Sequence, residues 1–221
     1  ATKELHIPSL LETFGIPYSG GSPQCLAYCY DKSLVRGVAI EMGIPVPAAF
    51  NVAPEEVTFI AFPLDFPVIV KPNFGDSSVG ITADSVCYDI GQLEQAIARV
   101  REWYGFSCPV LVEEYLTGKD ISVGIIGNPP DSYSVLPIIA EDYSGLPDGL
   151  PQICGYEAKW DADSEYFSML RSIPAVLPQA TVEFLHASCI RQYSRCSRCP
   201  QAACSTISVA AITGIQQTNN G

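Results

Sequence analysis

The sequence predicts an α+β protein, in which helices and antiparallel strand pairs follow one another without an internal repeat of elements. Residues 91–104 place apolar side chains at helical spacing on one face, as an amphipathic helix requires. Residues 66–70 form a short apolar run typical of a buried strand. Residues 120–126 alternate in polarity, and after a turn at 128–131 the chain returns over 133–139, which predicts a β-hairpin.

Start and stop signals place the remaining elements. Asp31 can cap a helix over residues 32–42, and Gly43 permits the left-handed backbone that ends it. Pro178 suits the first turn of a helix over residues 179–188. The other expected elements are a helix over 8–14 that stops at Gly15, an extended turn over 16–21, a link held extended by Pro45 and Pro47, a strand through Ile81 and Thr82, a strand over 110–112 and a Gly/Pro-rich loop over 141–155.

Composition and charge exclude several classes of protein. The chain has 221 residues, 48% of them hydrophobic, and a formal net charge of −12. Non-specific binding to nucleic acid or to anionic lipid needs a basic surface, so neither partner is expected. No apolar run approaches the roughly 18 residues of a transmembrane helix, and no signal-peptide pattern opens the chain. Nine cysteines without such a signal indicate a reducing, cytoplasmic location with free thiols.

The charge is unevenly distributed along the chain. Every acidic residue lies at or before Glu183, so residues 1–183 carry a net charge of −15 and residues 184–221 carry +3. Four of the nine cysteines also fall in the second stretch. A change of composition this sharp marks a boundary, which is a domain edge, a disordered tail or an artefact of the reading frame.

The first motif with chemical meaning is the loop after Lys71. This lysine ends an apolar strand and is followed by the hydroxyls of Ser77 and Ser78. Gly75 and Gly80 let backbone N–H groups turn toward an anion. The combination suits a polyphosphate, although it is not the standard P-loop, in which the lysine follows the glycines. A β-hairpin turn with a solvated lysine is the alternative interpretation.

The second motif spans residues 113–120. Glu113 and Glu114 end a buried strand and point to opposite faces, so one can face a cleft. Leu116 offers a backbone N–H and C=O beside apolar cover, as an adenine edge needs, and Asp120 can accept hydrogen bonds from ribose hydroxyls. An edge-strand charge pair followed by a turn is the alternative.

The third motif spans residues 155–160, where Lys159 stands between aromatic side chains after the long Gly/Pro-rich loop. Its functional interpretation is a lid that delivers a cation to a phosphate. Its structural interpretation is an aromatic-anchored loop with a surface lysine.

These three motifs, with Lys32 directly after Asp31, resemble those of the ATP-grasp ligases, and most closely the D-alanine–D-alanine ligase branch. Residues 11–20 are similar to the family's segment before the helical lysine, and the resemblance covers residues 7–188. It implies an ATP-grasp fold, with two α/β subdomains that sandwich the nucleotide, incomplete at both ends of this chain. The domains it implies are the end of an N-terminal substrate domain over 1–30, a central subdomain over 31–116, a partial C-terminal subdomain over 117–188 and a divergent, poorly ordered, cysteine-rich tail over 189–221.

The resemblance implies an ATP-dependent carboxylate–amine ligase of peptidoglycan precursor synthesis. ATP converts a carboxylate to an acyl phosphate, and an amine then attacks to form an amide of the D-alanyl-D-alanine type. The substrate is a small amino acid, and a homodimer is implied for intact members. By the same resemblance, the α- and β-phosphates are assigned to Lys32 and Lys71, the transferring phosphate to Ser77, Ser78 and Lys159, adenine to Glu113, Glu114, Tyr115 and Leu116, and the ribose to Asp120.

The sequence also departs from the family pattern. Asp76 stands where the family has Gly before its paired serines, and Trp160 replaces a tyrosine whose hydroxyl could bond the serine loop, which leaves the acceptor substrate open. Most of the domain that binds the first amino acid would precede Ala1. The family holds two Mg²⁺ (or Mn²⁺) ions through carboxylates near its end, but none follows Glu183. No metal ligand is therefore assigned, and the activity of this chain is expected to be impaired.

Two other functions stay open. A catalytically inactive fragment that binds nucleotide would keep the same three motifs without the metal ligands. A zinc-stabilised interaction module would use the thiols of the tail, although their spacing matches no familiar zinc finger. These thiols belong to Cys189, Cys196, Cys199 and Cys204.

Overall fold

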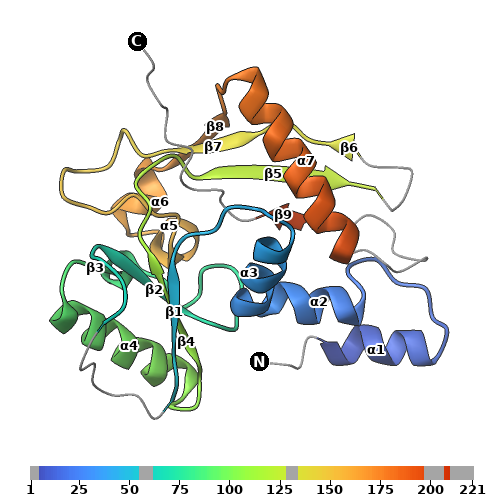
Figure 1. The fold of residues 1–221 in the computed structure, drawn as a ribbon, viewed down its shortest axis with the longest axis horizontal. Coiled ribbons are helices and arrows are strands. Elements are labelled where there is room, and N and C mark those ends of the chain that lie inside the picture. Colours follow the sequence, from blue (N-terminus) through green and yellow to red (C-terminus); the bar gives the residue numbers. More distant parts are fainter. Residues whose placement is uncertain (1–4, 55–61, 128–133, 197–206, 210–221) are drawn as a thin grey trace. The chain divides into compact units, whose positions relative to one another are not determined.

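The structure, a computed structural model, describes residues 5–54, 62–127, 134–196 and 207–209 (Figure 1). Contacts divide the chain into two compact units, each assembled from stretches that are distant in the sequence. Unit 1 takes its described residues from 1–45, 121–140 and 172–212, and unit 2 from 46–120 and 141–171. The expected domain limits at residues 30, 116 and 188 divide the chain consecutively and stay a prediction. Among the described helices, none is long and apolar enough to cross a membrane.

Unit 2 is built on a four-stranded sheet in which each neighbouring pair of strands is antiparallel. In spatial order, its strands are β1 (Ala49–Val52), β4 (Val110–Glu114), β2 (Val68–Pro72) and β3 (Val86–Cys87). The strands expected over 66–70 and 110–112 are confirmed as β2 and β4, and they are direct neighbours. This mixture of helices and antiparallel sheet confirms the α+β class.

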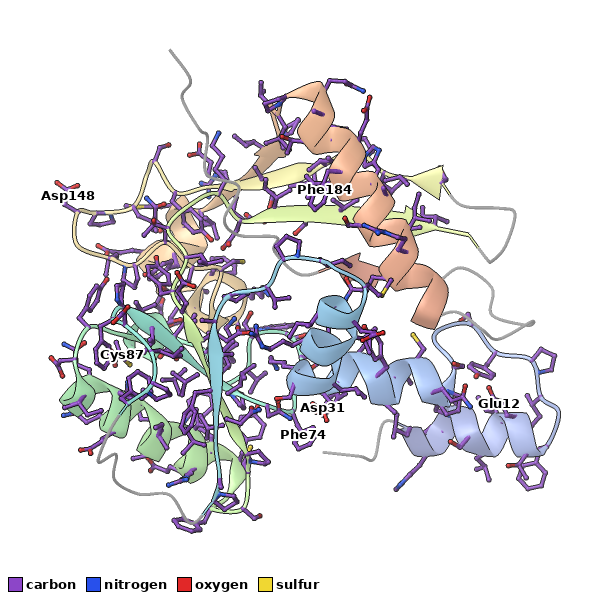
Figure 2. All side chains as sticks on the ribbon, viewed as in Figure 1. Glu12, Asp31, Phe74, Cys87, Asp148 and Phe184 are labelled. Carbon is purple, nitrogen blue, oxygen red and sulfur yellow. The ribbon has the colours of Figure 1, made fainter. Side chains whose placement is uncertain are left out.

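Helix α4 (Ile90–Tyr104) covers one face of this sheet (Figure 1). It begins at a capped turn, because the N–H of Gln92 donates to a carboxylate oxygen of Asp89 at 2.9 Å. Figure 2 shows side chains filling the space between the helix and the strands around Cys87. The helix expected over 91–104 is confirmed. The buried members of this core are Val52, Val68, Val70, Cys87, Leu93, Ala96, Ile97, Val100, Cys108, Val110 and Val112.

The opposite face of the sheet carries the alternate residues of the same strands. Because side chains alternate along a strand, Ile69 and Lys71 of β2 point away from α4, as Glu113 of β4 does. Ile69 packs there in a second cluster with Tyr166 and Ile153. Two short helices belong to the segment that covers this cluster, α5 (Tyr156–Trp160) and α6 (Glu165–Met169).

Unit 1 contains most of a second sheet, covered by helix α7 (Gln179–Cys196). The alternating burial of β5 sends Ile121, Val123 and Ile125 into a core shared with Leu185 of α7. The strand expected over 120–126 is thereby confirmed. The strands of this sheet are β6 (Ser134–Val135), β5 (Ile121–Ile126), β7 (Ile139–Asp142) and β8 (Arg171–Pro174) in spatial order, with β9 (Ile207–Val209) also paired to β5.

Three further helices lie in the described part of unit 1. They are α1 (His6–Thr13), α2 (Pro23–Tyr30) and α3 (Lys32–Glu41). The expected cap of α3 is confirmed, since the N–H of Leu34 donates to Asp31 at 3.0 Å, and Gly43 follows the helix with a positive φ of 66°. The expected helix over 8–14 is confirmed as α1.

The strand expected through Ile81 and Thr82 is wrong. Thr82 instead caps a 3-10 turn over Ala83–Ser85, and the hydroxyl of Ser85 accepts a hydrogen bond from the N–H of Thr82 at 3.0 Å. This reciprocal capping satisfies backbone groups locally, so the chain reaches strand geometry only at β3.

Two other expectations are modified. The return strand of the hairpin is split into β6 and β7, both paired to β5, and Pro137 between them has no N–H to donate. The turn over 128–131 and Tyr133 lie outside the described residues. The helix expected to end at 188 continues to Cys196, so the stretch expected to be poorly ordered includes a helical segment as well as strand β9.

Candidate functional site

Lys71 and Glu113 form an ion pair on the face of the unit 2 sheet that points away from α4. Glu113 stands opposite Ile69 in the register of β4 and β2, and Lys71 is two residues further along β2, on the same face. Lys71 Nζ lies 2.6 Å from Glu113 Oε2, and the two side chains are 26% and 12% exposed. The prediction that the two consecutive glutamates face opposite ways is confirmed, because Glu114 is exposed.

The serine loop, residues 73–80, leaves β2 directly after this lysine. Ser77 and Ser78 both have left-handed backbones, with φ of 52° and 60°, which non-glycine residues seldom adopt. Two turn hydrogen bonds hold this geometry, from the N–H of Val79 to Asp76 O at 3.1 Å and from the N–H of Ile81 to Ser78 O at 3.0 Å. Asp76 is exposed, so the anion that departs from the family pattern lies at the solvent.

Tyr104, at the end of α4, packs against the serine loop and supports it. Its hydroxyl donates to Val79 O at 3.0 Å. Its ring lies against both glycines of the loop, and a Cβ added at Gly80 would come within 2.9 Å of Tyr104 Cε2. The two glycines therefore serve close packing as well as backbone freedom, and Tyr104 is a supporting residue that the sequence motifs did not indicate.

The lid motif is fastened to the serine loop. Lys159 Nζ donates to Ser78 Oγ at 2.8 Å, and Ser78 Oγ donates in turn to Cys154 O at 3.0 Å. The indole N–H of Trp160 donates to Ser77 O at 3.0 Å. Trp160 lacks the tyrosine hydroxyl of the family pattern, but its indole N–H supplies a hydrogen bond of its own to the loop.

Two further hydrogen bonds anchor the start of the lid. The N–H of Tyr156 donates to Ile81 O at 2.7 Å, and Glu157 Oε1 accepts from the N–H of Ala83 at 2.9 Å. The second bond makes Glu157 a supporting residue that the sequence motifs did not indicate. Together these contacts join residues 74 to 83 positions apart in the sequence, and they bring Lys159 to the serine pair.

The segment expected to meet adenine follows β4. The hydroxyl of Tyr115 donates to Gln152 O at 3.3 Å, and burial raises the pKa of this phenol above its usual value. Glu114 accepts from the N–H of Ala48 at 3.4 Å. Within the described part of the chain, neither backbone group of Leu116 makes a hydrogen bond. Its N–H and C=O are thus available to the edge of a planar base.

Asp120 meets a residue that the motifs did not indicate. Tyr143 is buried, and its hydroxyl donates to Asp120 Oδ2. Burial and the neighbouring carboxylate both raise the pKa of Tyr143 well above its usual range. The only signal in the sequence was an aromatic residue at the start of a Gly/Pro-rich loop, which by itself indicates packing.

Cys154 lies near Ser78 and Lys159, since its C=O accepts from Ser78 and its thiol senses the charge of Lys159. Burial raises the pKa of its thiol above the ordinary value, and the positive charge of Lys159 opposes this rise only in part. The thiol is therefore protonated near neutral pH and is a poor nucleophile.

Lys32 is not among the residues that unit 2 brings together. It is the first residue of α3, in unit 1, and its assignment to a phosphate stays a prediction.

The described residues do not fit a metal site. They contain no group of three or more His, Cys, Asp or Glu side chains that could hold an ion, so the donors that Mg²⁺ or Mn²⁺ requires are not assembled there. For the zinc hypothesis, Cys189 of α7 is buried in the core that this helix shares with β5, and the other three thiols lie outside the described side chains. That hypothesis stays a prediction.

Comparisons with known proteins place these features in context. A sequence model described as D-ala D-ala ligase C-terminus matches residues 41–200. A D-alanine–D-alanine ligase of Bacillus anthracis is 30% identical over 175 residues, which are 78% of this chain and 52% of the relative. An uncharacterised protein, y4sG of Sinorhizobium fredii, is 34% identical over 134 residues, 61% of this chain and 37% of the relative. The chain thus spans about half or less of these two relatives.

Solved structures give the same picture. A crystal structure of the Bacillus anthracis D-alanine–D-alanine ligase matches with a TM-score of 0.65 and 26% identity, covering 91% of this chain and 63% of that one. The VanG D-Ala:D-Ser ligase of Enterococcus faecalis matches with a TM-score of 0.64 and 21% identity, covering 90% and 52%. At that identity, the second likeness concerns the fold alone.

Proposed function

Because the chain belongs to the D-ala D-ala ligase C-terminus family and has the ATP-grasp fold of its ligases, we propose that unit 2 binds ATP. The reaction it would serve is the joining of two small amino acids through an acyl phosphate, as in D-alanyl-D-alanine formation for peptidoglycan precursors. A cytoplasmic location and a homodimer, both expected for the family, belong to the same proposal.

One observation supports the ATP site most directly. Lys159 donates to Ser78 on a serine loop whose left-handed backbone is held by hydrogen bonds, and Lys71 stands at the start of the same loop. Phosphoryl transfer depends mainly on positioning and charge neutralisation, which lysines and hydroxyls on a braced loop can supply. An aromatic-anchored surface loop would not require the lysine to meet the serine pair.

The roles proposed for the individual residues are those that the resemblance to the ATP-grasp ligases implies. Lys71 would exchange its bond to Glu113 for a phosphate oxygen of the nucleotide, whose polyphosphate carries a larger total negative charge than one carboxylate. The hydroxyls of the serine pair and Lys159 would contact the terminal phosphate from the lid side. Leu116 would present its N–H and C=O to adenine, alongside Glu113. The assignment of Lys32 to a phosphate, which the resemblance implies, belongs to the same proposal.

The second candidate function is nucleotide binding with impaired turnover by the polypeptide of this sequence. It is supported by the absence of carboxylates from residues 184–221 and by the lack of an assembled metal site among the described residues. When bound, the metal of the family would supply neutralisation of phosphate charge. No step through it is derived for these residues.

Calorimetric titration of the 221-residue chain with ATP tests the proposal. Lys159→Ala is expected to weaken binding about tenfold, since it removes a charged donor from the phosphate. Arg171→Ala, which removes one positive charge from an exposed position, is the matched control and should leave the affinity unchanged. Absence of ATP binding by the unaltered chain would refute the nucleotide site. Phosphate release with Mg²⁺ present would refute impaired turnover.

A further inference from the structure

Two hydrogen bonds, one between side chains and one between backbone groups, hold Asp120 and the segment of Tyr143 together. At the side chains, the Tyr143 hydroxyl donates to Asp120 Oδ2. At the backbone, the N–H of Glu141 donates to the C=O of Asp120 at 2.9 Å. Strand β7 therefore holds the start of the following loop, with its tyrosine, beside the residue that precedes β5. The two residues are 23 positions apart, so the contact is a product of the fold.

The two oxygens of the Asp120 carboxylate are in different situations. Oδ2 accepts from the buried hydroxyl, whereas Oδ1 makes no hydrogen bond to any residue that the structure describes. Asp120 is half-buried, while Tyr143 is only 6% exposed. The carboxylate is thus held on its inner side and open on the other.

Tyr143 acts as a donor under all ordinary conditions. Its pKa lies far above the usual range because of burial and the adjacent carboxylate, so the hydroxyl keeps its proton. A carboxylate only accepts hydrogen bonds. A fixed donor on one of its oxygens therefore restrains the rotation of the Asp120 carboxylate about its side-chain bonds. Such preorganisation lowers the cost of ordering the acceptor when a ligand binds.

We infer that Tyr143 is a positioning residue for recognition of the ribose: it holds Asp120 Oδ2 so that Oδ1 accepts a hydrogen bond from a ribose hydroxyl of the nucleotide. This inference rests on the proposed ATP site and adds a residue and a selectivity to it. It makes the site discriminate between nucleotides with and without ribose hydroxyls.

Titration of the full chain with ATP and with 2′,3′-dideoxy-ATP tests the inference. The unaltered chain is expected to bind ATP about tenfold more tightly, as suits a hydrogen bond to a charged acceptor. Tyr143→Phe should lower affinity for ATP while changing affinity for the dideoxy nucleotide little, so the preference falls to about two- to threefold. Tyr166→Phe is the matched control, since its buried hydroxyl donates to Pro151 O at 2.7 Å, and it should keep the full preference.

Asp120→Asn gives a second, independent variant. It should also reduce the preference for ATP, and Tyr143→Phe added to it should reduce that preference no further. Thermal melts of each variant confirm folding. If Tyr143→Phe does not fold, retention of the full preference by Asp120→Asn overturns the inference.

Failure of the inference and failure of the proposed function give different results. If the unaltered chain binds ATP and the dideoxy nucleotide equally, the positioning role is overturned while the ATP site stands. If Tyr143→Phe weakens both nucleotides to the same extent, Tyr143 is merely structural and the inference is again overturned. If the unaltered chain binds neither, the ATP site itself is refuted, and the inference falls with it.

Discussion

At the scale of single residues, the pair Lys71–Glu113 shows how the register of two strands places a lysine beside a compensating carboxylate. Both side chains are mostly buried, at 26% and 12% exposure, and lie 2.6 Å apart. A lysine in such surroundings needs a compensating partner, because desolvation penalises an isolated charge. Glu113 supplies one within the sheet itself, so that the cation of Lys71 is already held in place for the phosphate of the proposed function.

This arrangement predicts a loss of stability on neutralising the glutamate. Glu113→Gln should lower the free energy of unfolding by about 1–2 kcal/mol, because Lys71 keeps only a neutral acceptor. Urea denaturation followed by circular dichroism measures this difference. The neighbouring Glu114→Gln is the matched control, since the same change at an exposed residue should cost less than about 0.5 kcal/mol. Equal losses in both variants would contradict the special role of the pair.

At the scale of elements, helix α4 and the lid brace the serine loop from two sides. Tyr104 at the end of α4 bonds Val79 O and packs against the loop glycines. Lys159 and Trp160 bond the serine pair from the lid. These contacts stabilise a left-handed backbone at two serines, a conformation that would otherwise cost about 1–3 kcal/mol each.

Gly80→Ala tests the bracing. The new Cβ would meet Tyr104 Cε2 at 2.9 Å, and the backbone there has a φ of 78°, so both packing and conformation oppose the methyl group. We expect a loss of about 1–2 kcal/mol in the free energy of unfolding, with weaker ATP binding.

Gly37→Ala is the control for that substitution. Gly37 lies within α3, and nothing comes within 4 Å of its added Cβ. The same change should there raise stability by about 0.5–1 kcal/mol, through helix propensity. A destabilisation at Gly37 equal to that at Gly80 would show that the effect is not one of loop geometry.

At the scale of the whole molecule, buried thiols couple the stability of both units to alkaline pH. Burial raises the pKa of Cys87 in unit 2 and of Cys189 in unit 1 to about 11 in each case. Between the ordinary thiol pKa and about 11, the unfolded chain has lost a proton that the folded chain retains. The unfolded state then binds fewer protons, so the free energy of unfolding falls as the pH rises.

Cys87→Ala isolates one of these contributions. Between pH 8 and pH 11 the free energy of unfolding of the unaltered chain should fall by about 2 kcal/mol more than that of this variant. The reason is that the Cys87 thiol ionises in the unfolded chain but stays protonated in the folded chain. Urea denaturation at several pH values measures the slopes, so a constant packing cost of the alanine does not matter. Cys29→Ala, at an exposed thiol, is the control and should keep the slope of the unaltered chain. Parallel slopes for the Cys87 variant and the unaltered chain would refute the linkage.

Prediction from sequence succeeded where the signal is local. The cap at Asp31, the amphipathic face of α4 and the alternation of β5 each depend on neighbours a few residues away. Prediction failed or was silent where the deciding contacts are distant. The short elements α2, α6, β1 and β8 carry too little periodicity to be recognised, and β1 exists because it pairs with β4 more than 50 residues later.

The sequence by itself determined the chemistry of the site: a lysine at a strand end, a serine pair, two glutamates with opposite orientations and an aspartate, in the order of the ATP-grasp ligases. It also determined the change in charge after Glu183. Only the tertiary structure decided which of these groups meet. Lys159 reaches Ser78 across 81 residues, and Tyr143 reaches Asp120 from the loop that follows β7. The physical reason is that chemical type belongs to a residue, whereas hydrogen bonding and burial depend on contacts that exist only after the strands have paired.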